Sequence, residues 1–364
     1  MLAAFALRAT ARQARNHSMH WLALLLGLFP LAQQAAAQAV PPPSNGVSES
    51  APAVPAQPFD EWLQSLIEEA RARGFSNEIV DATLKGLEPL PRVIERDRSQ
   101  AELRPGFGRY SASHLTRTMV TRGRDLSNEF AAILQKVESD YDVQRRFVVA
   151  IWGMESRYGR LTGRTPVFQA LATLAWEPRR ADYFRGELFD ALSMVASGHI
   201  EPEAMTGSWA GAMGQAQFMP SNYLKYAVDF NRDGRTDIWK SPGDALASIA
   251  NYLKGFGWNA KETWGREVKV PASAREKISE SIPRRTEGCY AIRNMTTRVP
   301  LDRWRKLGVT RLDGGPLPDV DVPAGLVDVG ERTFLVYPNY DAILGYNCAH
   351  YYALTVALLA DRLR

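Results

Sequence analysis

Hydrophobic residues near the start of the globular part of the chain recur with the period of an α-helix. From Phe59 to Ala70, apolar side chains fall at i, i+3, i+4, i+7, i+8 and i+11, which predicts an amphipathic helix. The stretch 86–125 is rich in Arg and shows no clear period. Further helices are expected in these segments: 76–85, two helices in 126–158 that break near Tyr141-Asp142, two in 166–198 that end at Gly198, and the second half of 208–226.

The segment 241–258 carries the signals of a helix start. Ser241 can cap the helix, Pro242 suits its first turn, and Asp244 completes a capping box. The expected buried stripe of this helix is Leu246, Ile249 and Leu253.

The pattern changes after Gly265, where short runs of β-branched and aromatic residues alternate with Gly and Pro. Such runs predict strands. The expected strands are REVKVP (266–271), GCYAIRN (288–294) and RTFLVYP (332–338), interrupted by a short helix in RVPLDRWRKLGV (298–309). We therefore expect a mainly α, α+β protein with a helical part at 58–265, a small β-rich domain at 266–337, and a C-terminal segment at 338–364 whose helix packs back through Leu354, Leu358 and Leu359.

The N-terminus has the three-part layout of a secretory signal peptide. Residues 1–20 carry three Arg and no acid, residues 21–32 are almost wholly apolar, and small residues follow as far as Ala39. A signal peptide at 1–39 would leave the Pro-, Ala- and Ser-rich stretch 40–57 as a disordered linker. A buried helix or a short anchor is the alternative, but the apolar run falls short of the roughly 20 residues that span a bilayer. No Cys lies near the cut, so we expect an exported chain with no stable membrane anchor.

Charge and composition exclude some partner classes. The chain has 44 basic and 40 acidic residues, and removal of the three leader Arg leaves 41 basic residues against 40 acidic. A nearly balanced mature chain gives no electrostatic argument for nucleic acid. The mature His residues are His114, His199 and His350, and none lies at metal-ligand spacing from another. Cys289 and Cys348 are the only cysteines, so an exported chain permits one disulfide, with two buried thiols as the alternative.

The segment 145–163 places an acid on an apolar helix face. A carboxylate in such surroundings is costly to ionise, which is what a general acid near neutral pH needs. The alternative is that Glu155 lies at the edge of a core and pairs with Arg157 or Arg160. The residues that share this face, at spacings of 4, 4 and 3, are Phe147, Ile151, Glu155 and Tyr158.

The segment 208–226 combines a Gly-rich turn with neutral polar side chains. Glycines allow a ligand to approach the backbone closely. Neutral donors beside aromatic rings suit a carbohydrate, although a tight helix-packing turn is the alternative. The polar side chains in this turn are Ser208, Gln215 and Gln217.

These segments together resemble the lytic murein transglycosylase B family, glycoside hydrolase family 103. The resemblance is carried by ESRYG at 155–159 and SWAGAMGQAQFMPSNY at 208–223. It continues through 226–239, 241–258 and YPNYDAILGYN at 337–347, and it covers about residues 58–362. It implies a lysozyme-like helical core with an additional α domain and a small β domain.

The resemblance also implies an activity and a site. The reaction is non-hydrolytic cleavage of the MurNAc–GlcNAc bond of peptidoglycan glycan strands in the periplasm, which leaves a 1,6-anhydro-MurNAc end. The catalytic acid falls on Glu155, and Arg179 and Arg180 match positions that face the peptide stem. The other substrate-side positions fall on Tyr110, Ser208, Gln217, Tyr252, Asn339 and Tyr346.

A single carboxylate suffices for this reaction if the sugar supplies the nucleophile. Ordinary glycosidases pair two carboxylates, and no second acid accompanies Glu155 in its motif. Glu155 would protonate the leaving oxygen and then accept the proton of the C6 hydroxyl. The alternatives are a lysozyme-type hydrolase that uses water and a non-catalytic wall-binding protein.

The loop that starts at Asp229 resembles a calcium loop. No cofactor is required by the family, but a structural calcium ion occurs in a matching loop of some members. Lys240 stands at position 12, where a bidentate Glu is usual, unless Asp244 reaches in. The alternative is an acidic turn held by Arg232 and Arg235. The candidate ligands, at positions 1, 3, 5, 7 and 9, are Asp229, Asn231, Asp233, the carbonyl of Arg235, and Asp237.

Overall fold

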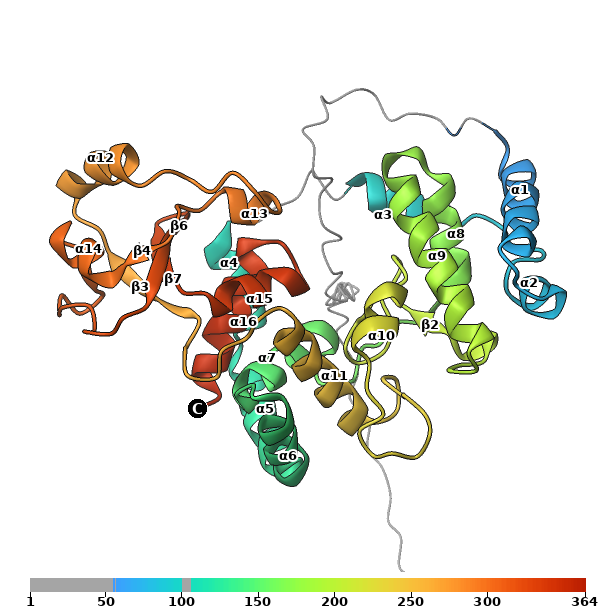
Figure 1. Cartoon of the computed structure of the whole chain (residues 1–364), viewed down its shortest axis with the longest axis horizontal. Coiled ribbons are helices and arrows are strands. Elements are labelled where there is room, and N and C mark those ends of the chain that lie inside the picture. Colours follow the sequence, from blue (N-terminus) through green and yellow to red (C-terminus); the bar gives the residue numbers. More distant parts are fainter. Residues whose placement is uncertain (1–54, 56, 100–105) are drawn as a thin grey trace, which may run out of the picture. The chain divides into compact units, whose positions relative to one another are not determined.

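A computed structural model describes residue 55 and residues 57–99 and 106–364 (Figure 1). The predicted signal peptide and nearly all of the predicted linker lie outside the described residues. The helices before residue 157 are α1 (Phe59–Ala72), α2 (Asn77–Thr83), α3 (Pro91–Ser99), α4 (Phe107–His114), α5 (Arg117–Glu129), α6 (Ala131–Tyr141) and α7 (Arg145–Ser156). Those of the middle are α8 (Val167–Trp176), η1 (Pro178–Arg180), α9 (Ala181–Ala196), η2 (Pro202–Ala204), α10 (Pro220–Tyr226) and α11 (Pro242–Gly255).

The C-terminal third combines short helices with a sheet. Its helices are α12 (Ala272–Ser281), α13 (Tyr290–Arg293), α14 (Leu301–Lys306), α15 (Asn339–Tyr346) and α16 (His350–Arg362). Its strands are β3 (Gly265–Lys269), β4 (Val299–Pro300), β5 (Thr310–Arg311), β6 (Pro323–Val329) and β7 (Arg332–Val336). They form an antiparallel sheet in the order β4-β6-β7-β3-β5. A two-stranded pair, β1 (Thr165–Pro166) with β2 (Thr206–Gly207), lies in the helical part.

Several sequence predictions differ from this architecture. The Arg-rich stretch 86–125 holds α3, α4 and most of α5, whose polar faces hid their helical period. The predicted strand at 288–294 is wrong, because Tyr290–Arg293 forms the short helix α13. Strand β6, which is buried over most of its length and lies between β4 and β7, was not predicted.

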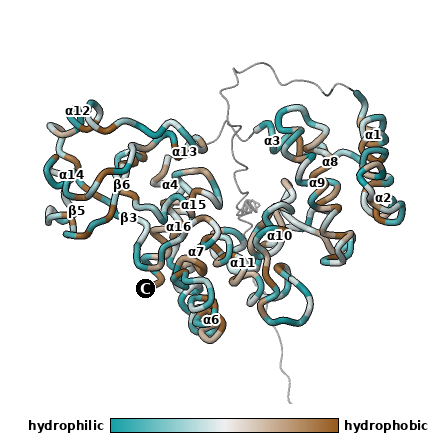
Figure 2. The backbone as a smooth tube through the Cα atoms, in the orientation of Figure 1, coloured by the Kyte–Doolittle hydropathy of each residue, from teal (hydrophilic) through white to brown (hydrophobic). Residues whose placement is uncertain are grey.

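Helix α7 lies at the centre of the helical core. It contacts α5, α6, α11 and α16, and every residue from Phe147 to Ser156 is buried. In Figure 2, hydrophobic residues recur along helices α7, α8 and α9. Leu246, Ile249 and Leu253 of α11 are fully buried, as the predicted stripe requires. Because its neighbours pack closely around it, a buried helix holds each of its side chains in a fixed position. A polar side chain on α7 is therefore well placed to form a site.

The sheet separates two hydrophobic cores. Along β7, Phe334 and Val336 pack into the main core, whereas Leu335 between them packs into a smaller one. This alternation follows from the two-residue period of a strand. The smaller core centres on Trp304, whose indole N–H donates to the carbonyl of Ala324 at 3.0 Å. Both faces of the sheet are therefore covered by packed side chains.

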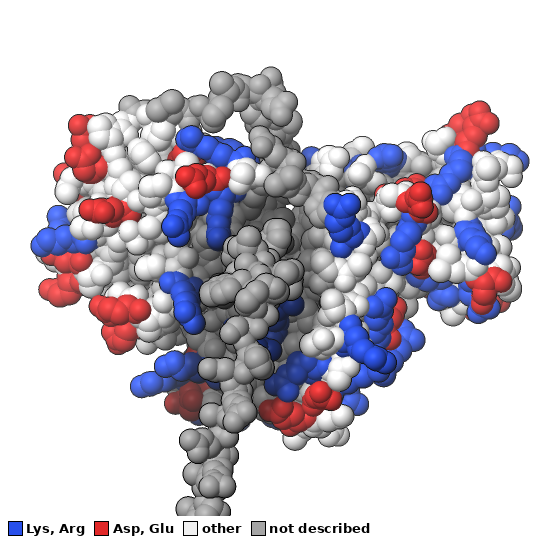
Figure 3. All heavy atoms as spheres, turned by 180° about the vertical axis from the view of Figure 1, so that it is seen from behind, with Lys and Arg blue, Asp and Glu red and all other residues white. Residues whose placement is uncertain are grey.

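The described residues contain no single helix that is long and apolar enough to cross a membrane. Among the described helices, only α15 and α16 taken together are long and apolar enough, and they are bent by 119° at their junction. On the face drawn in Figure 3, cationic and anionic side chains of the described residues are interspersed.

Candidate active site

Glu155 is held deep in the helical core by its position on α7. Its side chain is 3% exposed, whereas Arg157 and Arg160 are exposed. Tyr158 does not continue the helix face, because α7 ends at Ser156 and Tyr158 adopts a left-handed conformation with φ 61°. The prediction of a four-residue face on one helix is therefore right for its first three members and wrong for Tyr158.

The Glu155 carboxylate accepts a hydrogen bond from Tyr352 of α16. The Tyr352 hydroxyl lies 2.5 Å from Oε1 of Glu155, and both side chains are buried. A hydrogen bond to a carboxylate is stronger than one between neutral groups. Sequence patterns did not single out Tyr352, although its place one helical turn before Val356 on the buried side of α16 was a usable signal.

Four tyrosines from four helices respond to the charge of Glu155. Burial, and then the negative charge of Glu155, raises the pKa of Tyr110 to about 12. Burial first, with Glu155 contributing, also raises the pKa values of three further tyrosines: Tyr252, Tyr346 and Tyr352. These hydroxyls therefore stay protonated and neutral at neutral pH. The tyrosines come from α4, α11, α15 and α16.

Tyr252 and Tyr346 form one aromatic wall. Their ring centroids are 4.7 Å apart. The Tyr252 hydroxyl donates to the carbonyl of Gly345 at 2.6 Å, and the Tyr346 hydroxyl donates to the carbonyl of Ala216 at 2.6 Å. Phe218 packs against both rings. The Gly-rich turn and α15 are thereby joined through the two tyrosines.

The Gly-rich turn is a tightly bonded backbone structure. The Ser208 hydroxyl oxygen accepts from the amide N–H groups of Ala210 and Ala212 at 3.3 and 3.1 Å. Gln217 has φ 51°, and its side-chain amide donates to the carbonyl of Thr162 at 3.1 Å. A Cβ at Gly163 would meet the carbonyl of Gly207, so only Gly permits the two segments to lie this close. This contact brings the end of the 145–163 segment to the Gly-rich turn.

Two Asn residues near α15 have different environments. Asn339 is fully buried, and its amide group bonds the backbone of Asn259 and Glu262 at 2.7–3.1 Å. Its contacts assign Asn339 to holding the loop before β3 and do not bring it to the tyrosine cluster. Asn347 follows Tyr346 directly, is 5% exposed, and has a buried Oδ1 without a hydrogen-bond partner. Asn347 lies in the same quoted motif and is the better candidate for a ligand contact.

Arg179 and Arg180 converge on a buried carboxylate. Arg179 bonds both oxygens of Asp97, at 2.7 and 2.8 Å, and Arg180 pairs with the same group. Desolvation by burial raises the pKa of Asp97, but the hydrogen bonds and charges of the two guanidinium groups together lower it by more, so the pKa lies below its usual value. Arg179 remains 43% exposed at its side chain and can meet a further anion, whereas Arg180 is largely enclosed.

The other buried acids of the described residues are engaged elsewhere. Glu187 accepts from the backbone and hydroxyl of Ser221 at 2.9 and 2.7 Å, at the start of α10. Glu177 pairs with Arg98 at 2.9 Å. Neither acid bonds a tyrosine of the cluster directly, although Glu187 also accepts from Tyr183, whose charge interacts with that of Tyr252.

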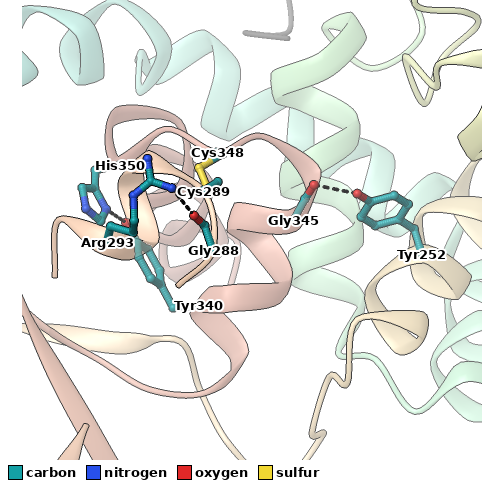
Figure 4. The surroundings of a disulfide bond; sticks show 8 residues. All are labelled: Tyr252, Gly288, Cys289, Arg293, Tyr340, Gly345, Cys348 and His350. Carbon is teal, nitrogen blue, oxygen red and sulfur yellow. Dashed lines mark hydrogen bonds between the residues drawn. A yellow bond between two sulfur atoms is a disulfide. The ribbon is translucent and has the colours of Figure 1, made fainter. Parts of the chain in front are cut away.

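A disulfide lies beside the α15–α16 junction (Figure 4). Cys289 and Cys348 are bonded, with their Cα atoms 6.3 Å apart. Nearby, Nδ1 of His350 lies 2.9 Å from the hydroxyl of Tyr340. A cavity of about 310 Å³ is lined in part by the disulfide, Phe256, Tyr346 and Asn347. The disulfide is thus close to the aromatic wall of the site.

The polar loop from Asp229 folds around its own side chains. Asp229 accepts from the amide groups of Asp233 and Gly234 at 3.2 and 2.9 Å. Asp244 is fully buried, and its two oxygens accept from the amides of Phe230 and Asp237 at 3.1 and 2.8 Å. Asp244 therefore serves the loop backbone and does not replace the acid missing at Lys240.

Within the described residues, no three or more His, Cys, Asp and Glu side chains are arranged to hold a metal ion. The loop side chains also bond to each other, since the Asn231 amide donates to Asp233 at 2.8 Å. Asp237 uses Oδ1 for the amides of Trp239 and Lys240. Carboxylate and amide oxygens are the ligand type that calcium prefers, but the loop lacks the acidic ligand expected at position 12.

Comparisons with known proteins agree with this arrangement. The family described as "Transglycosylase SLT domain" matches residues 58–361. Membrane-bound lytic murein transglycosylase B of Escherichia coli is 33% identical over 298 residues, which cover 78% of this chain and 77% of that protein.

Solved structures of similar proteins share the fold. SltB3 from Pseudomonas aeruginosa, in complex with NAG-anhNAM-pentapeptide, is 41% identical with a TM-score of 0.76 and covers 84% of this chain and 79% of its own. The Escherichia coli lytic transglycosylase Slt35, in complex with calcium, is 30% identical with a TM-score of 0.68 and covers 85% and 93%. The lysozyme-like α+β fold is therefore confirmed, and the chain belongs to the transglycosylase SLT domain family.

Proposed function

We propose that this protein is a peptidoglycan lytic transglycosylase in which Glu155 is the only general acid and base. The observation that carries the proposal is a buried carboxylate that accepts a hydrogen bond from Tyr352 and interacts electrostatically with three further tyrosines, in a chain that belongs to this family throughout residues 58–361. The SltB3 complex holds a NAG-anhNAM-pentapeptide, and a ligand of that class suits neutral hydroxyls, an aromatic wall and a buried amide.

The proposed reaction uses one carboxyl group twice. Protonated Glu155 donates its proton to the glycosidic oxygen as the bond from that oxygen to the anomeric carbon breaks. The resulting carboxylate then accepts the proton of the C6 hydroxyl of the same MurNAc, and that oxygen bonds to the anomeric carbon. The intramolecular attack gains a large effective molarity, and no water is consumed. The acetamide of the sugar stabilises positive charge at the anomeric carbon.

The surrounding residues position the sugar and the acid. Tyr352 fixes the orientation of the Glu155 carboxyl group through its 2.5 Å hydrogen bond. Ser208 and Gln217 hold the Gly-rich turn close to the site, and Asn347 offers an unpartnered acceptor to an amide N–H or hydroxyl of the glycan. Arg179, half-exposed on Asp97, suits the carboxylate of a peptide stem.

Two other functions make different demands on the site. A lysozyme-type hydrolase needs a group that delivers water, and the other buried acids of the described residues are engaged elsewhere. A non-catalytic wall-binding protein has no use for a buried carboxylate held by a tyrosine. Mass spectrometry of borohydride-reduced products from purified sacculi separates all three, since anhydro ends cannot be reduced.

We also propose that the protein acts in the periplasm and that its loop at 229–240 binds calcium weakly. Periplasmic action is supported by the layout of residues 1–39 and by the location of its substrate. Weak calcium binding is supported by oxygen donors at Asp229, Asn231 and Asp233 beside the unfavourable Lys240. Cell fractionation with N-terminal sequencing of the mature chain tests the location.

A further inference from the structure

The α15–α16 corner carries both tyrosines that flank Glu155 from the C-terminal part of the chain. Tyr346 is the last residue of α15, and Tyr352 lies in the first turn of α16. The two helices are bent by 119° between them. The conformation of residues 347–349 therefore decides where the two hydroxyls lie relative to the carboxylate.

Across this corner the Tyr340 hydroxyl of α15 lies 2.9 Å from Nδ1 of His350 at the start of α16. Few hydrogen bonds hold residues 347–349 themselves. The amide of Asn347 donates to Ile343 at 3.3 Å, and the amide of Ala349 donates back to Asn347 at 2.8 Å. The Asn347 side-chain oxygen is unpartnered. A corner with so few internal bonds needs an external support to hold one conformation.

That support comes from the segment around α13. Cys348, in the middle of the corner, is bonded to Cys289 at the start of α13, 59 residues away in sequence (Figure 4). The same segment also holds α15, because Arg285 and Arg298 both pair with Asp341 at 2.6–2.9 Å. Of the disulfide and the two Arg–Asp341 pairs, the disulfide is the contact that involves a residue of the corner, Cys348.

We propose that the Cys289–Cys348 disulfide is a positioning element of the active site, which fixes the corner so that Tyr352 meets Glu155 at hydrogen-bonding distance. The inference rests on the proposed function and adds residues that do not touch the substrate. A misplacement of about 1 Å near a reacting group can lower a rate by about a hundredfold. A slack corner would therefore reduce turnover even in a folded protein.

The decisive experiment compares the wild type with Cys289→Ala/Cys348→Ala, using soluble glycan strands. We expect kcat to fall about tenfold while KM changes less than about twofold, since the substrate groups remain and only the acid is misplaced. Dithiothreitol, which is oxidised to its cyclic disulfide as the two thiols form, should lower kcat of the wild type equally, and reoxidation should restore it. The double variant is the control, because the reductant should leave it unchanged.

A double-mutant cycle with Tyr352→Phe separates positioning from general stability. If the disulfide acts through Tyr352, its removal should cost much less in the Tyr352→Phe background than in the wild type. Independent, multiplying losses would overturn the proposal, as would full kcat with two titratable thiols. Should the cysteine variant not fold, reduction and reoxidation of the wild type carry the test, and unchanged kcat of a folded, fully reduced wild type would overturn the proposal instead. Failure of the oxidised wild type to release anhydro ends would refute the proposed function itself.

Discussion

The hydroxyl of Tyr352 donates a 2.5 Å hydrogen bond to the carboxylate of Glu155, across 197 residues of sequence. The bond joins the central helix α7 to the C-terminal helix α16. It explains how a carboxylate that is 3% exposed is kept in one orientation inside a hydrophobic core. If the carboxylate had no such partner, the unmade hydrogen bond alone would destabilise the folded protein by about 1–3 kcal/mol.

Glu155→Gln should abolish cleavage and leave the fold intact. The substitution keeps the size of the side chain and its acceptor for Tyr352, but removes the group that titrates. General acid–base catalysis contributes about 10²–10⁴-fold, so anhydro-muropeptide release should fall by at least about 10²-fold. The measurement is product release from sacculi together with a thermal melt. Near-normal turnover would end the assignment of Glu155.

Tyr352→Phe should lower kcat by roughly 10- to 100-fold. A hydrogen bond to a charged group is worth about 1.5–3 kcal/mol, and about 1.4 kcal/mol corresponds to a factor of ten. Tyr351→Phe is the matched control, because Tyr351 lies one residue away on α16 and packs against the ring of Tyr110. Equal losses in the two variants would remove the special role of Tyr352.

The reaction products should end in 1,6-anhydro-MurNAc. The motivation is the buried Glu155 beside the tyrosines, with the other buried acids of the described residues engaged in pairs and caps. Products of the mature enzyme are reduced with borohydride and weighed, and anhydro ends should stay unreduced and lack the mass of one water. A majority of reducible ends would identify the protein as a hydrolase.

Calcium at millimolar concentration should raise the melting temperature only slightly. A site filled at about 100 times Kd would stabilise the protein by about 2.7 kcal/mol, but Lys240 and the committed oxygens of Asp244 reduce the donor set. The comparison is a melt with calcium and with chelator, and Asp229→Asn should remove the small rise. A large rise in the wild type would show that another oxygen replaces the missing acid.

Stability should decrease as pH falls through the range of His350. Burial lowers the pKa of His350 to about 4, below the value of about 6.5 expected in an unfolded chain. The unfolded state therefore binds more protons between these two values, and the free energy of unfolding declines as pH falls from 6.5 toward 4. In His350→Gln the decline in melting temperature over this window should be smaller. An identical pH dependence in both proteins would contradict the role of His350.

The sequence by itself determined those helices whose apolar residues recur with the period of an α-helix. It also determined that Glu155 lies on the helix that proves to be central, α7. Phe59–Ala72, the α11 stripe and the burial of Glu155 follow from local patterns, since period and capping act within a few residues. The quoted motifs also determined the family. By contrast, 290–293 was misjudged as a strand because a short apolar run fits either structure.

Only the tertiary structure decided which distant residues meet at Glu155. Tyr352 lies on the helix that follows the corner at 347–349, and the position of that corner depends on the bend between α15 and α16 and on a disulfide to α13. The side chain of Asn339, by contrast, is hydrogen-bonded to the backbone of the loop at 259–262. These contacts join residues 59 to 197 positions apart in the chain, and local periodicity carries no information on them. The physical reason is that a side chain's partner is set by packing of whole helices, whereas its own secondary structure is set by its neighbours in sequence.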